Sequence, residues 1–92
     1  MIKIIYEPEK NRSAAYDEGE NVGESTYSKS NNLWIIDHTL VDEKYGGEGV
    51  GTKLVAELVN QARMNNIKII PLCPYAKREF EKRPEYSDVL MK

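Results

Sequence analysis

The feature that most constrains this chain is a glycine cluster in residues 45–55, YGGEGVGTKLV, where four of six consecutive positions are glycine. Glycine loses more conformational freedom on folding than any other residue, so such a cluster needs a physical reason. The residues that follow are apolar at helical spacing: Val50, Leu54, Val55, Leu58, Val59 and Ala62. The cluster therefore stands at the start of a predicted amphipathic helix.

The start of a helix offers backbone N–H groups without internal acceptors, together with the positive end of the helix dipole. A glycine-rich turn lets phosphate oxygens approach these groups, because no Cβ stands in the way. Basic side chains near the cluster are few, Lys44 and Lys53. The segment therefore predicts a diphosphate site made mainly of backbone amides. A tight turn without a ligand is the alternative explanation.

Two common phosphate-binding motifs do not fit the spacing. A P-loop needs lysine after its second fixed glycine, but Thr52 follows Gly51 when the motif is counted from Gly46. The dinucleotide motif G-x-G-x-x-G fails as well, because counting from Gly47 places Thr52 at the last glycine position.

The rest of the chain predicts a small α/β domain. Residues 1–7, 12–17, 22–28 and 33–41 alternate with turn sequences, which favours an antiparallel meander. A helix separates the strand 33–41 from a short apolar strand at residues 67–72, so these two strands should be parallel neighbours. Pro74 suits the first turn of a last helix, which should end by Arg83, before Pro84.

Composition narrows the choice of partners and compartment. The 92 residues carry 13 Lys and Arg against 15 Asp and Glu, and this net charge of −2 argues against nucleic acid or an anionic membrane as partner. No apolar run approaches the roughly 20 residues that span a bilayer, and no signal peptide is visible. One cysteine cannot form an internal disulfide, which favours the cytoplasm. One Cys and one His also give no basis for a metal site.

Residues 41–55, VDEKYGGEGVGTKLV, resemble the acyl-CoA-binding motif of the GNAT acetyltransferase superfamily, Arg/Gln-x-x-Gly-x-Gly/Ala. Gly49 and Gly51 match its last two fixed positions, whereas Gly46 stands where the superfamily usually has Arg or Gln. Residues 35–39, IIDHT, and 69–86 resemble a minimal GNAT-like family marked by Pro-x-Cys-x-Tyr, here Pro71, Cys73 and Tyr75.

The resemblance covers nearly the whole chain and implies an α/β (α+β) fold of the small GNAT-like type. Its parts would be antiparallel N-terminal strands, the motif helix, a parallel strand pair and a C-terminal helix. Residues 1–92 would form a single N-acetyltransferase domain with acetyl-CoA as cosubstrate. The resemblance implies that the pyrophosphate binds the loop and that the pantetheine arm pairs with the strand 33–41, as a peptide pairs with a sheet edge. The implied cofactor-binding residues are Thr39, Leu40, Val41, Gly46, Gly47, Glu48, Gly49, Val50, Gly51, Thr52 and Tyr75.

Two side chains are candidates for catalysis near the implied thioester. An unperturbed imidazole titrates near neutral pH, so His38, the only histidine, would serve as general base. Cys73 precedes a helix and would accept the acetyl group covalently or sense oxidation. A histidine bonded to a backbone carbonyl and a small core cysteine are the alternatives. If the two strands are neighbours, a thiolate–imidazolium pair is a further hypothesis.

The function we expect is acetyl transfer to an amine of a small molecule or a protein. Many GNAT enzymes protonate the leaving thiolate with a tyrosine of the last helix, where this chain has Phe80. They also have N-terminal helices that wall the acceptor site. Here about forty residues precede the motif, and they leave little room for such helices. Both departures favour a rival hypothesis, a CoA-binding or acyl-CoA-sensing module without turnover.

Overall fold

The computed structural model describes residues 1–91, which form one five-stranded sheet in the order β1-β2-β3-β4-β5. The strands are β1 (Ile2–Glu7), β2 (Arg12–Asp17), β3 (Glu20–Ser30), β4 (Leu33–Val41) and β5 (Lys68–Pro71). The first four pair antiparallel, and β5 runs parallel to β4. The predicted meander and the parallel pair are both confirmed, and with them the mixed α/β class.

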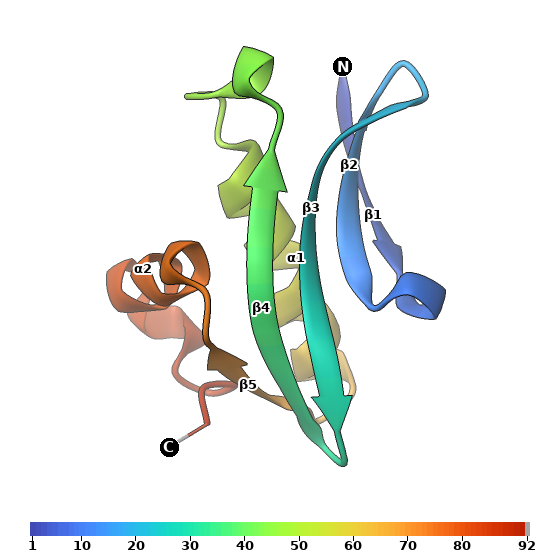
Figure 1. The fold of residues 1–92 in the computed structure, drawn as a ribbon. Coiled ribbons are helices and arrows are strands. Elements are labelled where there is room, and N and C mark those ends of the chain that lie inside the picture. Colours follow the sequence, from blue (N-terminus) through green and yellow to red (C-terminus); the bar gives the residue numbers. More distant parts are fainter. Residues whose placement is uncertain (92) are drawn as a thin grey trace.

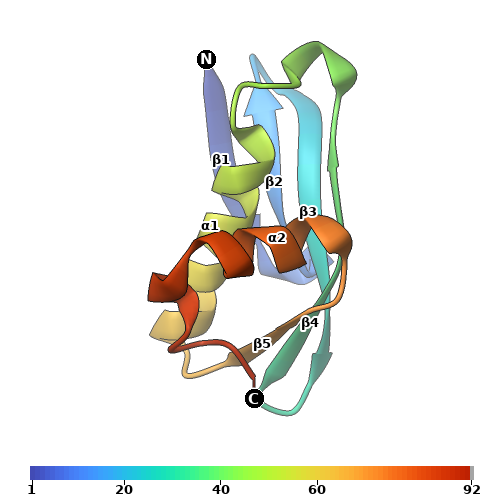
Figure 2. The ribbon, with the colours of Figure 1, turned by 90° about the vertical axis from the view of Figure 1, so that its left-hand side faces the viewer.

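Both α-helices cover one face of the sheet and leave the other face open (Figure 1, Figure 2). Helix α1 (Val50–Met64) connects β4 to β5, and helix α2 (Pro74–Lys82) follows β5. Three short 3-10 turns complete the chain: η1 (Pro8–Lys10), η2 (Glu43–Tyr45) and η3 (Pro84–Tyr86). Neither α-helix has the length and apolarity that a bilayer crossing needs, among the residues described.

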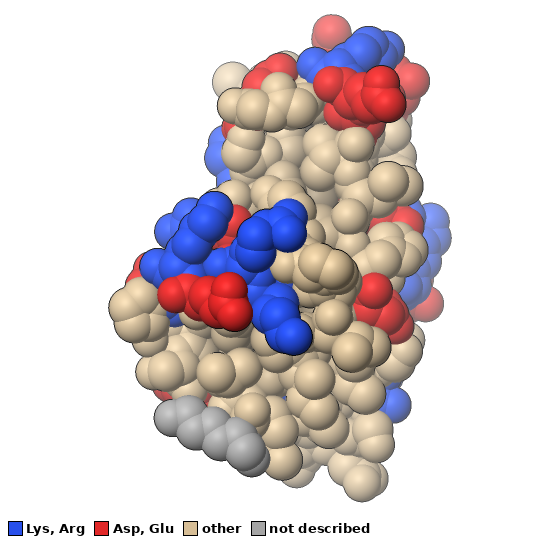
Figure 3. All heavy atoms as spheres, turned by 60° about the vertical axis from the view of Figure 1, so that its left-hand side comes forward, with Lys and Arg blue, Asp and Glu red and all other residues tan. Residues whose placement is uncertain are grey.

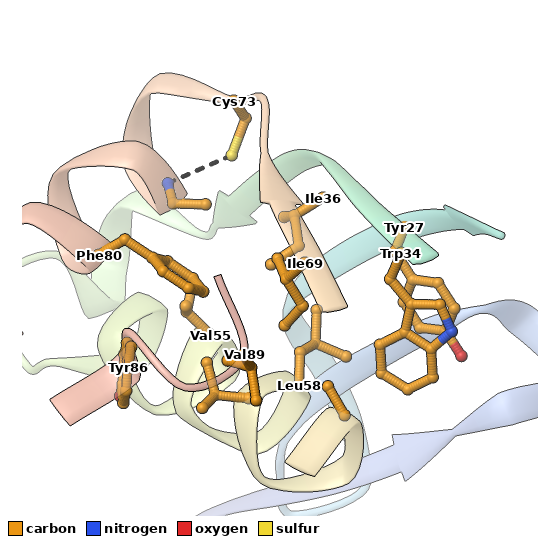
Figure 4. Packing of buried hydrophobic residues seen from close by; sticks show 13 residues of the cluster. Tyr27, Trp34, Ile36, Val55, Leu58, Ile69, Cys73, Phe80, Tyr86 and Val89 are labelled. Atoms are coloured by element: carbon orange, nitrogen blue, oxygen red, sulfur yellow. Dashed lines mark hydrogen bonds between the residues drawn. The ribbon is translucent and has the colours of Figure 1, made fainter. Parts of the chain in front are cut away.

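The core lies between the sheet and the two helices. The apolar stripe of α1 is fully buried, as its spacing predicts. Trp34 stacks on Tyr27 with ring centroids 4.0 Å apart, and Phe80 meets Tyr86 edge to face at 5.3 Å. Figure 4 shows these rings on either side of the aliphatic residues Ile36 and Ile69. The packed core fixes α1 and α2 against β4 and β5.

Strand β4 separates from β5 halfway along its length. The parallel pairing covers Leu33–Ile36 against Lys68–Pro71, and the N–H groups of Leu72 and Cys73 both donate to the carbonyl of Ile36. Beyond this point β5 turns into α2, so residues 37–41 of β4 have no strand partner on that side within residues 1–91. The separation exposes a short length of backbone edge beside the start of α2 (Figure 1).

A β-bulge in β4 changes which residues face the helices. Thr26 of β3 lies opposite His38 whereas Tyr27 lies opposite Ile36, so Asp37 is an extra residue. Strict alternation would have placed His38 on the same face as Ile36. Because of the bulge, the next residue on the helix side is Thr39, whose hydroxyl meets the buried Ser25 at 3.0 Å.

Candidate functional site

The glycine loop ends in a row of unpaired backbone donors at the start of α1. Within residues 1–91, no hydrogen-bond acceptor faces the N–H groups of Gly47, Gly49, Val50, Gly51 and Thr52. Gly47 and Gly49 have φ of 81° and 75°, which side chains with a Cβ rarely adopt. A Cβ added at either would meet nothing within 4 Å. The two glycines therefore serve the backbone path and leave open space above the amides.

Two other residues of the loop have their amides occupied. The N–H of Gly46 donates to the Glu43 carbonyl at 3.1 Å, and the N–H of Glu48 donates to the Tyr45 carbonyl at 3.3 Å. Gly46 has an extended backbone and ends η2. These bonds shape the loop, so the donors open to an anion are the N–H groups of Gly47 and residues 49–52, and those of Gly46 and Glu48 are excluded.

Gly51 is constrained by packing rather than by φ. A Cβ on Gly51 would lie 2.5 Å from the Tyr75 hydroxyl, so the phenol ring packs directly on the first turn of α1. The Tyr75 hydroxyl is also 3.5 Å from Oγ1 of Thr52. Tyr75 thus borders the row of amides that have no partner within residues 1–91.

Glu79 is a buried residue of this site that sequence reasoning missed. It is 4% exposed and accepts a hydrogen bond from Thr52 Oγ1 at 3.1 Å and an ion pair from Arg83 Nε at 2.9 Å. Its carboxylate ties α2 to the start of α1. The one sequence signal is the i, i+4 spacing of Tyr75, Glu79 and Arg83, which puts them on one helix face. Many charged residues on solvent-facing helix surfaces have the same spacing, so it does not predict that Glu79 is buried.

Exposed positive charge lies along α2, the helix whose Tyr75 borders the loop. Lys77, Arg78 and Lys82 are exposed, and Figure 3 shows Lys and Arg side chains gathered over α2. The guanidinium carbon of Arg78 lies 5.7 Å from the centre of the Tyr75 ring. Arg78, through Tyr75, therefore adds a basic group to this neighbourhood besides Lys44 and Lys53.

Cys73 caps α2 at the point where β4 and β5 separate. It is 6% exposed, and its Sγ accepts a hydrogen bond from the Ala76 N–H at 3.3 Å (Figure 4). The same Sγ is 3.6 Å from Oγ1 of Thr39. Cys73 thus lies on the helix side of the sheet, against the part of β4 that lacks a strand partner.

His38 lies on the open face of the sheet. Its Nε2 is 2.8 Å from Oε2 of Glu24, and its side chain is 55% exposed. Because the bulge turns His38 away from the helices, the structure does not bring His38 and Cys73 together as a hydrogen-bonded pair. The two catalytic candidates occupy opposite faces of β4.

Glu24 connects His38 to a chain of charged groups across the open face. Arg12 donates to Glu24 through Nη1 and to Glu7 through Nε, both at 2.7 Å. The hydrogen bond from His38, followed by that from Arg12, lowers the pKa of Glu24. Glu24 therefore stays a carboxylate at neutral pH. In the part of the chain described, no three His, Cys, Asp or Glu side chains group as a metal site would require.

Comparison with known proteins agrees with this geometry. The family model of GCN5-related N-acetyl-transferases matches residues 12–89. A GCN5-like protein from Staphylococcus aureus, assigned as an N-acetyltransferase, is 41% identical, with a TM-score of 0.77 over 97% of this chain and 87% of its own. No curated protein matches the chain in sequence.

Two larger proteins share the fold. A Bacillus anthracis protein assigned as a streptothricin acetyltransferase, solved with acetyl coenzyme A, is 30% identical over 64% of this chain and 36% of its own, with a TM-score of 0.55. The ribosomal-protein-S18-alanine N-acetyltransferase of Escherichia coli is 13% identical, with a TM-score of 0.65 over 77% of this chain and 49% of its own. On the family model and the Staphylococcus aureus relative together, this chain belongs to the GCN5-related N-acetyltransferase family.

Proposed function

We propose that this protein binds acetyl-CoA and transfers its acetyl group to an amine. The observation that carries the proposal is the row of five amides between Gly47 and Thr52 that have no partner within residues 1–91, next to the edge of β4 that has no strand partner there. A diphosphate matches such a row, because backbone donors at a helix start bind anions without a basic side chain. The acetyl coenzyme A held by the Bacillus anthracis relative supports the choice of cofactor.

The other parts of acetyl-CoA would bind to the surfaces next to the glycine loop. The exposed basic residues of α2 supply positive charge for the remaining phosphate, and Tyr75 borders the path between them and the loop. The pantetheine arm would lie along residues 39–41 of β4, adding a strand-like neighbour to the free edge. The thioester would then lie where β4 separates from β5, with Thr39 and Cys73 on its helix side and the open face that carries His38 on the other.

Two transfer routes are consistent with the positions of His38 and Cys73. In direct transfer, His38 accepts a proton from the amine, the amine nitrogen bonds to the thioester carbon, and CoA leaves as the thiolate. In a relay, the Cys73 sulfur first takes the acetyl group and releases CoA, and the amine then attacks the S-acetyl cysteine. His38 opens onto the uncovered face of the sheet, whereas Cys73 is buried beneath α2, which favours the direct route.

The amine would approach from the open face. A hollow of about 460 Å³ lies there between β3 and η2, and its lining includes Glu43 and Leu40, both exposed. A carboxylate beside an apolar side chain suits an amine with an apolar neighbouring group. Free acetyl-CoA and a reduced thiol at Cys73 fit a cytoplasmic protein.

Incubation with labelled acetyl-CoA and a panel of primary amines, polyamines and N-terminal peptides tests the proposal. We expect label on an amine for wild type and Cys73→Ser, and a large loss for His38→Gln. Label on the protein that disappears in Cys73→Ser would support the relay instead. No rise in melting temperature with acetyl-CoA would contradict the cofactor itself.

A non-catalytic acyl-CoA-binding module is the second candidate. The observation in its favour is Phe80, which is 8% exposed and packs on Tyr86, so the last helix offers no hydroxyl at that position. This candidate predicts the same thermal stabilisation by acetyl-CoA but no label on any amine or on the protein. The labelling experiment therefore separates the two functions.

A further inference from the structure

We propose that Glu24 is a positioning residue that fixes the tautomer of His38, leaving Nδ1 as the nitrogen that accepts the proton of the amine. This inference rests on the proposed role of His38 as the base. It concerns a residue on β3 that no motif of the sequence marks. The observation that supports it is the 2.8 Å contact between Glu24 Oε2 and His38 Nε2.

The direction of that hydrogen bond follows from the chemistry of its partners. An ionised carboxylate can only accept hydrogen bonds, so Nε2 of His38 must be the donor. In a neutral imidazole the other nitrogen then has no proton. The neutral ring is thus held with hydrogen on Nε2 and a free lone pair on Nδ1.

Arg12 determines which oxygen of Glu24 is available to His38. It occupies Oε1 of Glu24 at 2.7 Å, and its side chain is only 15% exposed, so Oε2 is the oxygen left for His38. Glu7 holds Arg12 from the other side at 2.7 Å. The chain Glu7–Arg12–Glu24 carries a net charge of −1, which compensates the positive charge of an imidazolium. The hydrogen bonds fix both the position and the protonation pattern of the ring.

The other charged group near His38 is already bound elsewhere. Asp37, its neighbour in β4, accepts hydrogen bonds from Thr26 Oγ1 and Ser28 Oγ, both at 2.7 Å. No hydrogen bond joins Asp37 to His38 among residues 1–91. Asp37 adds negative charge on this face without selecting a tautomer, which makes it a matched control for Glu24.

The proton balance of the transfer step is simple in this arrangement. The amine nitrogen forms a bond to the carbonyl carbon as the carbon–sulfur bond breaks, and the amine proton moves to Nδ1 of His38. The resulting imidazolium keeps its Nε2–H bond to Glu24. The departing thiolate then takes the proton from Nδ1, directly or through a bridging water, and the neutral ring returns to its starting tautomer.

Glu24→Gln tests the tautomer without changing the size of the side chain. Arg12 has only donors, so it will retain the amide oxygen, and the amide nitrogen will then face His38. A donor at that position requires Nε2 to accept, which moves the ring hydrogen to Nδ1. We expect Glu24→Gln to invert the tautomer and Asp37→Asn to leave it unchanged.

His38 is the only histidine, so nitrogen NMR of the labelled protein gives one pair of ring signals. At a pH where the nitrogen shifts themselves show a neutral ring, wild type should show a protonated Nε2 and an unprotonated Nδ1. With the best amine of the panel, Glu24→Gln should lower kcat by about 10²-fold, the lower end of general-base effects. KM for acetyl-CoA should not change, because Glu24 lies on the open face away from the loop.

The NMR and kinetic results test the role of Glu24 separately from the role of His38 as base. A protonated Nδ1 in wild type, or an unchanged tautomer in Glu24→Gln, would overturn the role of Glu24. If the tautomer inverts as expected but His38→Gln still acetylates amines at the wild-type rate, His38 is not the base and the proposed direct route fails. Inversion together with the loss of kcat supports both.

Discussion

The Tyr75 hydroxyl occupies the space into which a Cβ on Gly51 would point. The ideal Cβ would lie 2.5 Å from the hydroxyl oxygen and 2.6 Å from the adjoining ring carbon. Gly51 lies inside α1, where alanine would otherwise be favoured by up to about 1 kcal/mol. The contact therefore predicts opposite effects of Gly51→Ala with and without the Tyr75 ring.

We expect Gly51→Ala to destabilise the wild-type protein by about 1 kcal/mol, because overpacking displaces the ring. In a Tyr75→Ala background the same change should be neutral or stabilising. Urea denaturation of the four proteins gives the coupling free energy between the two positions. Equal effects of Gly51→Ala in the two backgrounds would show that the ring does not rest on Gly51.

Gly49→Ala should separate the cost of backbone strain from the cost to acetyl-CoA binding. Gly49 has φ of 75°, and Gly19, in the turn between β2 and β3, has φ of 82°; neither has an atom within 4 Å of an added Cβ. Both alanine variants should lose about 1–2 kcal/mol of stability, the cost of left-handed backbone. Only Gly49→Ala should also lose acetyl-CoA affinity, because its Cβ would enter the space above the free amides.

Calorimetric titration with acetyl-CoA checks this difference, with Gly19→Ala as the matched control. Wild-type affinity in both variants would mean that the phosphates bind elsewhere. A parallel loss in both variants would point to a general effect of stability rather than to the loop.

Thr52→Val should expose the dependence of the site on Glu79. The Thr52 hydroxyl donates to Glu79 Oε2 at 3.1 Å, and Glu79 is 4% exposed. Valine keeps the branched shape but removes the donor, which should cost about 1–3 kcal/mol because a buried charged acceptor loses a partner. Thr52→Ser retains the hydroxyl and should lose less. Chemical denaturation compares the two, and equal losses would assign the effect to packing.

The sequence predicted the order of elements because each depends on local signals. Alternation identified the strands, the apolar stripe identified α1, and Pro74 and Pro84 bracketed α2. Strand bounds that depend on tertiary contacts were predicted less accurately. Residues 67–72 were expected as a strand, but β5 covers only Lys68–Pro71, since the N–H of Leu72 already turns to the Ile36 carbonyl.

In the candidate site, too, features with a local sequence signal were predicted and features set by tertiary contacts were not. The glycine loop was recognisable because the positive φ angles of Gly47 and Gly49 belong to a backbone geometry that glycine favours. The relation of His38 to Cys73 was not, because it depends on the extra residue Asp37 in β4, and a bulge leaves no mark on apolar alternation. Glu24 and Glu79 were missed for a related reason: their partners are 14 and 27 residues away in sequence.

Glu7→Gln should remove part of the acid sensitivity of the fold. Glu7 accepts hydrogen bonds from the Tyr16 hydroxyl at 2.5 Å and from Arg12 at 2.7 Å, and these bonds lower its pKa. A carboxylate whose pKa is lowered in the native state stabilises the fold above its unfolded pKa of about 4.3, and this contribution is lost as pH falls through the native value.

Glutamine does not titrate, so the stability gap between wild type and Glu7→Gln should be largest at neutral pH. A gap of about 1 kcal/mol is expected there for a partly exposed charged hydrogen bond. It should close as pH falls below the ordinary glutamate range. Urea denaturation at several pH values measures the gap, with Glu9→Gln as control, since Glu9 is exposed and makes no side-chain hydrogen bond or ion pair within residues 1–91. A gap that stays constant with pH would show that Glu7 contributes through packing or neutral hydrogen bonding and that its negative charge has no part in holding Arg12 on the open face.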